Sequence, residues 1–312
     1  MRLSTCIVLL VLSCAAEAVE RPYIPARLDN GQPDMQGVWI ASNSTPLERP
    51  PGFTTLVIDE GQAAKLLASL DARAEDSSKP TEPTEYFDPL SLERIRGELR
   101  SSLIVDPPDG LIPGNELYKQ HFAQAMASVL NAMDGPEQRP SPERCLGSQT
   151  TQPPILSIRN GVNLHQIVQT SDSFVFTSEF VNTARIVRLN SKRMPAVVTT
   201  WLGDSIGRWE GDTLVAETRG FTPSDRFRVG ISGNFLVSPR TRVTERFVRV
   251  AQDRIDYTFT VEDPTYYTQP WTGESHFLRS DEPVLEYACH EANYSLIHIL
   301  EGAREQERRA QQ

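Results

Sequence analysis

The chain has 312 residues, of which 41 are acidic and 31 basic, and its net charge is −10. An acidic chain without a basic tract is poorly suited to bind nucleic acid or anionic lipid, so we expect small molecules, neutral or cationic, as its partners. After residues 1–18 no apolar run is long enough to cross a bilayer, and no transmembrane span is expected.

Residues 1–18 have the pattern of a secretory signal peptide. Arg2 precedes an apolar run at residues 6–13, and Ala16-Glu-Ala18 is a small-x-small cleavage signal. Cleavage after Ala18 predicts a protein that is exported to the periplasm or secreted. The string Val11-Leu-Ser-Cys14 leaves a second interpretation open, in which Cys14 of a lipoprotein signal is acylated.

Residues 19–150 predict an extended and helical segment that packs on a sheet. Asp34-Met-Gln-Gly-Val-Trp39 indicates the start of a first strand, and a Gly-x-Trp at this place also occurs at the start of lipocalin-like barrels. Asp59 is expected to cap a helix with an apolar face. Residues 75–90 are expected to form a loop or a lid, residues 103–110 a strand end and turn, and residues 115–133 a second helix.

Residues 151–312 predict a sheet followed by a C-terminal helix. Short segments of β-forming residues alternate with turn signals, which is typical of an antiparallel sandwich or barrel. The expected strands are 163–169, 174–179, 183–189, 197–202, 213–218, 241–250, 255–261 and 272–278, and the expected helix is 294–309. We therefore predict a mainly β, lipocalin-like antiparallel barrel or sandwich, with 19–150 and 151–312 forming one compact unit.

Two cysteines remain after the signal peptide, Cys145 and Cys289. In an exported protein two leftover thiols most simply form one disulfide. The alternative is a thiol nucleophile, to which the neighbouring His290 draws attention. Adjacent side chains point apart, however, so the disulfide is the favoured prediction.

Several strings in the chain recur together in one protein family. They are Pro33–Trp39, Thr45–Pro50, Leu103–Gly110, Glu143–Cys145, Gln166–Gln169, Ala184–Ile186, Trp201–Val215, Val261–Pro264, Pro270–Thr272 and Glu286–Asn293. With them the chain resembles a large family of exported, mostly uncharacterised bacterial proteins, abundant in acidobacteria and some proteobacteria, that carry the string W-x-G-D-S-x-G-x-W-E-G-D-T-L-V.

The resemblance covers nearly the whole chain after residue 18. It implies export, and the family's two cysteines match Cys145 and Cys289, in agreement with a disulfide. It implies no particular activity. Members tend to carry His where this chain has Asn182, so a mechanism that needs a base at that position is doubtful here.

The sequence lacks the common motifs of metal, nucleotide and serine-hydrolase sites. It has no His-x-His, Cys-x-x-Cys or His-Glu-x-x-His pattern, and its glycine patterns do not follow strand-to-helix junctions. A Gly-x-Ser-x-Gly elbow is also missing. We therefore expect no metal and no cofactor, which leaves acid–base catalysis by side chains or plain binding.

The candidate catalytic residues before residue 190 are a histidine and a Glu-Arg pair, all on expected strands. His165 would carry protons near neutral pH if it faced a barrel interior, and otherwise it is a structural histidine. Glu179 and Arg185 are expected to face one another across a turn. Such a pair orients a substrate carboxylate or carbonyl, or it is a structural ion pair.

The string Trp201–Val215 predicts a strand, a tight Gly-Asp turn and a second strand, with an aromatic wall beside carboxylates. Asp204 is a candidate catalytic acid or base because it follows a strand end. Glu210 is a second candidate, and the ring of Trp209 is expected to raise its pKa by excluding water. Asp212 is more typical of a turn residue that bonds its own backbone.

Six further residues are candidates for substrate binding. Trp201, Trp209 and Trp271 are expected to line a dry pocket. His290, Asn293 and Tyr294 either cap that pocket with polar groups or anchor the C-terminal helix.

Three functions follow from these candidates. The first is an exported, cofactor-free hydrolase, lyase or isomerase that acts on a small, neutral, partly apolar or sugar-like compound. The second is a lipocalin-like carrier without catalysis. The third is an envelope interaction module without a pocket, which a filled barrel interior would favour.

Overall fold

The computed structural model describes residues 23–41, 43–77, 91–147, 149–156, 163–223, 227–228, 233–291 and 293–312. The predicted signal peptide and the alternative acylation site at Cys14 lie outside the described residues, as does most of the loop expected at 75–90.

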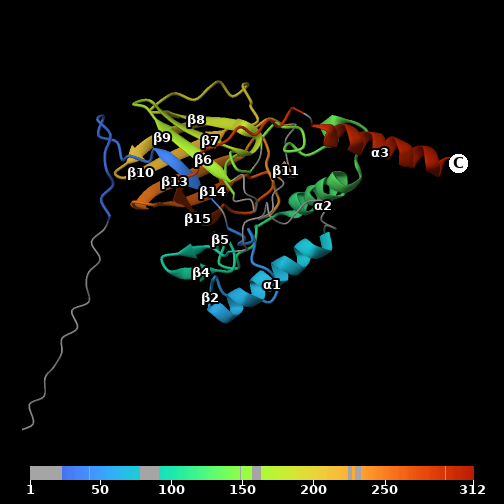
Figure 1. Cartoon of the computed structure of the whole chain (residues 1–312), viewed down its shortest axis with the longest axis horizontal. Helices are drawn as coiled ribbons and strands as arrows, with labels where there is room; N and C mark the ends of the chain where they lie inside the picture. Colours follow the sequence, from blue (N-terminus) through green and yellow to red (C-terminus); the bar gives the residue numbers. More distant parts are fainter. Residues whose placement is uncertain are drawn as a thin grey trace, which may run out of the picture.

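The described chain is built around a closed β-barrel (Figure 1). Its strands follow the order β1-β6-β7-β8-β9-β10-β13-β14-β15, and the barrel closes because β1 pairs with both β6 and β15. Their bounds are β1 Gly37–Ile40, β6 Leu164–Gln169, β7 Ser173–Ser178, β8 Thr183–Leu189, β9 Asp204–Glu210, β10 Thr213–Arg219, β13 Arg242–Ala251, β14 Arg254–Glu262 and β15 Trp271–Ser280. The predicted mainly β barrel is thus confirmed, and the sandwich alternative is not adopted.

The remaining elements come mostly from the N-terminal half and the C-terminal tail. β5, Ile104–Asp106, extends the sheet beside β15. The others are β2 Val57–Ile58, β3 Arg94–Ile95 and β4 Glu98–Arg100 in a small sheet, β11 Phe227–Arg228 and β12 Phe235–Leu236 in a hairpin, the helices α1 Glu60–Ser77, α2 Glu116–Asn131 and α3 Tyr294–Ala310, and 3-10 turns at Pro136–Gln138 and Phe180–Asn182. None of the described helices is long and apolar enough to span a bilayer.

Side chains along the barrel strands alternate between the interior and the outer surface, as expected for strands buried on one face. In β14 every second residue is buried, from Ile255 through Tyr257 and Phe259 to Val261. The turn between β9 and β10 contains Gly211 with φ +61°, a left-handed conformation that favours glycine. The sequence predicted this turn and β10, whereas β9 was not among the expected strands.

One predicted strand, 197–202, is wrong. β8 and β9 pair in parallel, with Val187 opposite Ser205, so the chain must return between them over the outside of the barrel. Residues 190–203 make this crossover, and Val197 within it is 87% exposed. Its β-branched residues imitate a strand, but only an isolated bridge between Thr200 and Phe221 forms there.

The N-terminal segment contributes to the barrel and also packs on it. β1 and β5 both join the barrel sheet, so the barrel draws on both of the expected segments. Helix α1 packs through Ala63 and Leu66 on the small β2–β4–β3 sheet, and Figure 1 shows it beside β2 and β4. Both predicted N-terminal helices are present. The Asp59 Oδ1 atom accepts from the Gln62 amide at 2.8 Å, which caps the start of α1.

Aromatic side chains occupy the barrel interior. Phe176, Phe247, Tyr257 and Phe277 are each at most 2% exposed, and their ring centroids lie 4.9 to 6.4 Å apart. Residues 149–156 pack on this cluster, and the Ile155 amide donates to the Tyr257 hydroxyl at 2.8 Å. The interior therefore serves as the hydrophobic core of the protein.

The predicted disulfide between Cys145 and Cys289 is present. It closes a loop with a sequence separation of 144 and joins the middle of the chain to the segment before α3. Such a bond fits an exported protein, because disulfides persist in oxidising compartments. Figure 1 shows α3 extending away from the barrel.

Candidate functional site

A charged cluster in the barrel interior is centred on Arg185 of β8. Its Nη1 donates to Glu245 Oε1 at 3.0 Å, and its Nη2 donates to Glu245 Oε2. Its Nε donates to Ser205 Oγ and its Nη2 to Thr218 Oγ1, both at 3.0 Å. Tyr257 donates its hydroxyl to Glu245 Oε1 at 2.8 Å. The charges and hydroxyls are thus bonded to one another, as a buried ion pair requires.

The expected pairing of Glu179 with Arg185 is wrong. Glu179 lies after β7, and its Oε1 accepts from the Leu285 amide at 3.0 Å. It is 5% exposed and ties the C-terminal segment to the barrel. Arg185 points into the barrel instead, because it alternates with the outward side chains of β8, and there it meets Glu245 from β13.

His165 faces the barrel interior, but not as a proton carrier near neutral pH. Its ring lies 4.8 Å from Phe176 and 5.7 Å from Phe277, and its Nδ1 has no hydrogen-bond partner. Complete burial lowers its pKa to about 3, because no group compensates the loss of water around a charged ring. His165 is therefore neutral at physiological pH and packs as an aromatic side chain.

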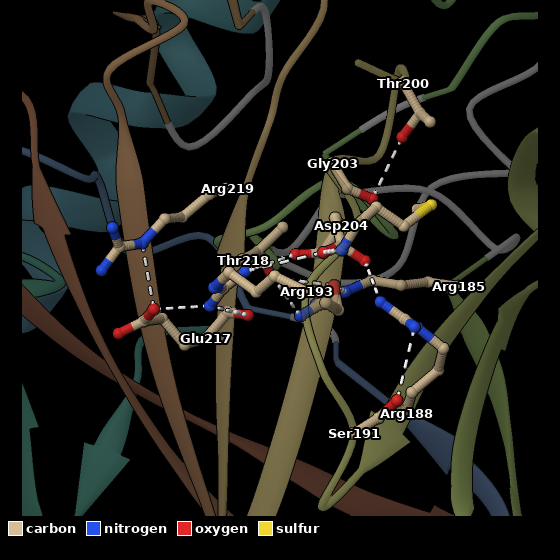
Figure 2. A network of polar contacts seen from close by, with 12 residues as sticks. Arg185, Arg188, Ser191, Arg193, Thr200, Gly203, Asp204, Glu217, Thr218 and Arg219 are labelled. Atoms are coloured by element: carbon tan, nitrogen blue, oxygen red, sulfur yellow. Dashed lines mark hydrogen bonds and ion pairs between the residues drawn. The ribbon is translucent and has the colours of Figure 1, made fainter. Parts of the chain in front are cut away.

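Asp204 holds the crossover segment 190–203 against the barrel (Figure 2). Its Oδ1 accepts from Arg188 Nη2 at 2.6 Å, and its Oδ2 accepts from the Met194 amide at 2.9 Å. Arg193 donates to the Asp204 carbonyl at 3.0 Å and also pairs with Glu217. These contacts give Asp204 a structural role in fastening the crossover.

Glu210 lies on the outer surface at the end of β9, and the expected rise in its pKa is wrong. Hydrogen bonds from Arg246, at 2.8 Å, and from Arg208 hold its pKa below the usual range. Trp209 packs on the core from the opposite face of the strand. Adjacent strand residues face opposite sides, so the indole does not shield the carboxylate from water.

The three tryptophans do not share one pocket. Trp271 is fully buried among Phe235, Phe259 and Tyr267, with ring centroids 5.6 to 5.9 Å away. Trp209 lies beside Leu214, which pairs with Phe247 in the middle of β13. Trp271 instead lies at the level of Val243, near the start of that strand. Trp201 lies in the crossover, with the Arg144 guanidinium 5.6 Å from its ring.

His290, Asn293 and Tyr294 lie just before and at the start of α3, and none of them lines either of the two cavities described below. The Asn293 side chain accepts from the Leu296 amide and donates to the Glu143 carbonyl at 3.1 Å, beside Cys145. Tyr294 is 63% exposed, and His290 is exposed as well. Of the two expectations for these residues, the anchoring of the C-terminal helix is the one that Asn293 fulfils.

A cavity that the sequence did not indicate lies between α2 and the β11–β12 hairpin. We call it the α2 pocket; its volume is about 300 Å³, and it is lined by His121, Gln124, Ala125, Ser128, Phe227, Leu236 and Tyr266. It is located near the end of the barrel at which Trp271 begins β15, since Tyr266 and Leu236 are neighbours in sequence of the Trp271 contacts Tyr267 and Phe235. Apolar side chains thus line much of a recess next to the core.

Four of the residues that line the α2 pocket carry polar groups, His121, Gln124, Ser128 and Tyr266, and two of them are in contact. His121 Nδ1 lies 3.2 Å from the Tyr266 hydroxyl, and the two rings meet edge to face. The positions of α2 are fixed by its cap, since the Asn115 side chain accepts from the Tyr118 amide at 2.9 Å. Tyr118 then stacks on Phe122, which meets Phe227 edge-on at 5.5 Å. From the sequence, helical spacing shows only that these residues share one face of α2. It does not show that this face packs on the β11–β12 hairpin, which is distant in sequence.

Comparisons with known proteins assign no family. No family model matches the chain, and no curated protein matches it. Among solved structures, a mutant of the fluorescent protein UnaG is 15% identical, with a TM-score of 0.25, over 46% of this chain and 87% of that one. The apo lipid binding protein 8 of Caenorhabditis elegans is 8% identical, with a TM-score of 0.22, over 38% of this chain and 70% of that one. Because both scores are low, the barrel is assigned from its strand pairing alone.

Proposed function

We propose that this protein binds a small, mainly apolar molecule with one hydrogen-bonding group, and that it holds this ligand in the α2 pocket without catalysis. The observation that carries the proposal is the pocket itself: Ala125, Phe227 and Leu236 supply an apolar wall beside the His121–Tyr266 pair. Ligand sites are typically concave and mostly apolar, with a few polar groups that fix orientation. A volume of about 300 Å³ is at the lower end of their range, so the ligand is small.

The packing of the barrel supports a site outside its interior. A lipocalin-like carrier was expected to hold its ligand inside, but aromatic rings and the Arg185–Glu245 pair occupy that space here. Insertion of a ligand there would break packing contacts and a buried ion pair, which is costly. The α2 pocket requires no such disruption.

The placement of the candidate acids and bases supports binding over catalysis. General acid–base catalysis needs titratable groups within reach of one substrate. His165 is buried in the aromatic core, Asp204 is bonded to the crossover, and Glu210 is on the outer surface. These three groups do not line a common cavity, so they do not form the acid–base pair around one substrate that the enzyme hypothesis requires.

The polar pair defines what the ligand needs. A neutral histidine has one donor and one acceptor nitrogen, and a tyrosine hydroxyl both donates and accepts. A hydroxyl group on the ligand would satisfy either partner. We therefore expect a compact aromatic or terpenoid alcohol to bind more tightly than the corresponding hydrocarbon.

The test is a titration of the oxidised protein with 2-naphthol and with naphthalene, followed by ligand-observed NMR. We expect 2-naphthol to bind more tightly, and the His121→Leu variant to reduce that preference. Ala125→Leu fills the pocket and is expected to weaken 2-naphthol at least tenfold. Ala123→Leu, at an exposed position of the same helix, is the matched control and should bind as the wild type does.

The outcome separates the remaining hypotheses. Equal weakening by Ala123→Leu and Ala125→Leu would place the ligand elsewhere and overturn the proposal. Turnover of the compound, detected by mass spectrometry, would restore the enzyme hypothesis. A failure of aromatic, terpenoid and sugar-derived compounds alike to bind would leave the interaction module as the better account.

A further inference from the structure

A second cavity lies at the other end of the barrel, where the N-terminal segment passes the ends of β13 and β15. We call it the Arg249–Arg279 cavity; it measures about 610 Å³ and is lined by Tyr23, Ala26, Asp34, Gln36, Gly37, Arg249, Gln252 and Arg279. Two of these residues carry guanidinium groups. The cavity is distinct from the α2 pocket, with which it shares no lining residue.

Arg249 provides a nearly buried positive charge. It is 7% exposed, and its guanidinium donates to three backbone carbonyls, those of Asp34 at 2.7 Å, Gln252 at 2.6 Å and Ala251 at 3.3 Å. Carbonyls satisfy hydrogen bonds but do not neutralise the charge. Its Cζ lies 5.4 Å from the centre of the Trp39 ring, which fixes the plane of the group.

Arg279 brings a second guanidinium to the same indole. Its Cζ lies 5.7 Å from the centre of the Trp39 ring, and its Nη1 reaches the Gln36 carbonyl at 3.4 Å. The group lies directly against Gly37, where a Cβ atom would come within 2.8 Å of Nη1. Gly37 also has φ +133°, a backbone conformation that favours glycine.

The charges of the lining leave one positive charge in excess. Among the described residues neither arginine has a carboxylate within ion-pair distance, although the chain as a whole is strongly acidic. Asp34 is the acidic residue of the lining, and its Oδ1 accepts from the Gln36 amide at 2.9 Å. One net positive charge suits a monoanion, which leaves the lining neutral, whereas the second charge of a dianion would meet no uncompensated cation.

We propose that the Arg249–Arg279 cavity binds the carboxylate of a small organic monoanion. A guanidinium matches a carboxylate with two parallel N–H donors, and the Trp39 ring holds both arginines in place for it. The cavity is larger than a carboxylate group needs, and Tyr23 with the arginine stems supplies surface for a ring or short alkyl chain. The occupant is thus an aryl or alkyl carboxylate, bound independently of the α2 pocket.

The experiment is calorimetric titration at low ionic strength with benzoate, its neutral analogue benzamide and the dianion phthalate. Benzoate should bind at least tenfold more tightly than benzamide and no less tightly than phthalate. Arg279→Gln should weaken benzoate at least tenfold. Arg240→Gln removes the same charge from an exposed arginine outside the cavity and should leave the affinity unchanged.

Thermal melting followed by circular dichroism checks that Arg279→Gln is folded. A second variant tests the cavity in a way that does not depend on the folding of the first. Gln252→Glu adds a negative charge at an exposed position of the lining and should also weaken benzoate. Ala125→Leu in the α2 pocket should have no effect on benzoate. Three results would overturn the proposal. They are equal affinities for benzoate and benzamide, an unchanged benzoate affinity in both Arg279→Gln and Gln252→Glu, and no binding of benzoate to the wild type.

Discussion

Arg185 and Glu245 form an ion pair inside the barrel, in which the two side chains are 2% and 0% exposed. They are 60 residues apart in sequence and lie on β8 and β13, which do not pair with each other. Hydroxyls of Ser205, Thr218 and Tyr257 complete their hydrogen bonds. The pair therefore bridges the interior and fixes the relative positions of separate strands.

Arg185→Met is expected to destabilise the protein by about 3–5 kcal/mol, because Glu245 would remain buried without its counter-ion. The free energy of unfolding from urea denaturation measures this loss. The double variant Arg185→Met with Glu245→Leu should be more stable than Arg185→Met alone, because it leaves no unpaired charge. If Arg185→Met alone were as stable as the wild type, the pair would not be a structural element.

His165 is expected to make the protein less stable as the pH falls from 7 to 5. Its pKa in the folded state is depressed to about 3, so protonation at pH 5 is open mainly to the unfolded chain. The stabilisation is present above the ordinary histidine pKa of about 6.5 and is lost progressively below it, down to the folded value. At pH 5 the loss from this residue should be about 2 kcal/mol relative to pH 7.

The measurement is urea denaturation of the wild type and of His165→Leu at both pH values. The variant should lack this part of the pH dependence, and the difference between the two proteins should shift by about the same amount. Parallel pH dependence in both proteins would mean that the buried ring is not the titrating group.

Asp204→Ala is expected to release the crossover segment 190–203 without unfolding the barrel. The variant removes the acceptor for the Met194 amide, which lies in this segment, and for Arg188 of β8, whose guanidinium also donates to Ser191 in the segment. Hydrogen exchange of the amides in 190–203 should become faster, while exchange in β13 and β14 should not change. Glu210→Ala is the control, because this exposed carboxylate pairs with arginines but fastens no loop.

Cys289→Ser is expected to lower the free energy of unfolding by about 2–5 kcal/mol, because the disulfide closes a long loop and restricts the unfolded chain. Cys145→Ser should have the same effect, and reduction of the wild type should reproduce both. Hydrogen exchange in α3 should also increase, since Asn293 is positioned beside this bond. Unequal effects of the two serine variants would point to a separate role for one cysteine.

Much of the local structure was predictable from the sequence because it depends on neighbours in the chain. Alternating residues predicted β13, β14 and β15, and Asp59 and the helical spacing after residue 115 predicted α1 and α2. The disulfide was predictable from the count of cysteines in an exported chain. The prediction of a strand at 197–202 was wrong because β-branched residues are also compatible with an exposed crossover. The sequence does not show that β8 and β9 pair in parallel and need such a crossover.

The sequence alone was enough to predict most of the longer strands, the three helices and the Gly-Asp turn, because periodicity, caps and turn residues act over a few positions. It also determined that His165 and Arg185 lie on alternating strands. The partners of these side chains depend on the closure of the barrel, which brings Glu245 to Arg185 and aromatic rings to His165. The tertiary structure also places α2 beside the β11–β12 hairpin, and Arg249 and Arg279 over Trp39. The sequence did not indicate these sites, because cavities and charge pairs depend on contacts between segments far apart in the chain.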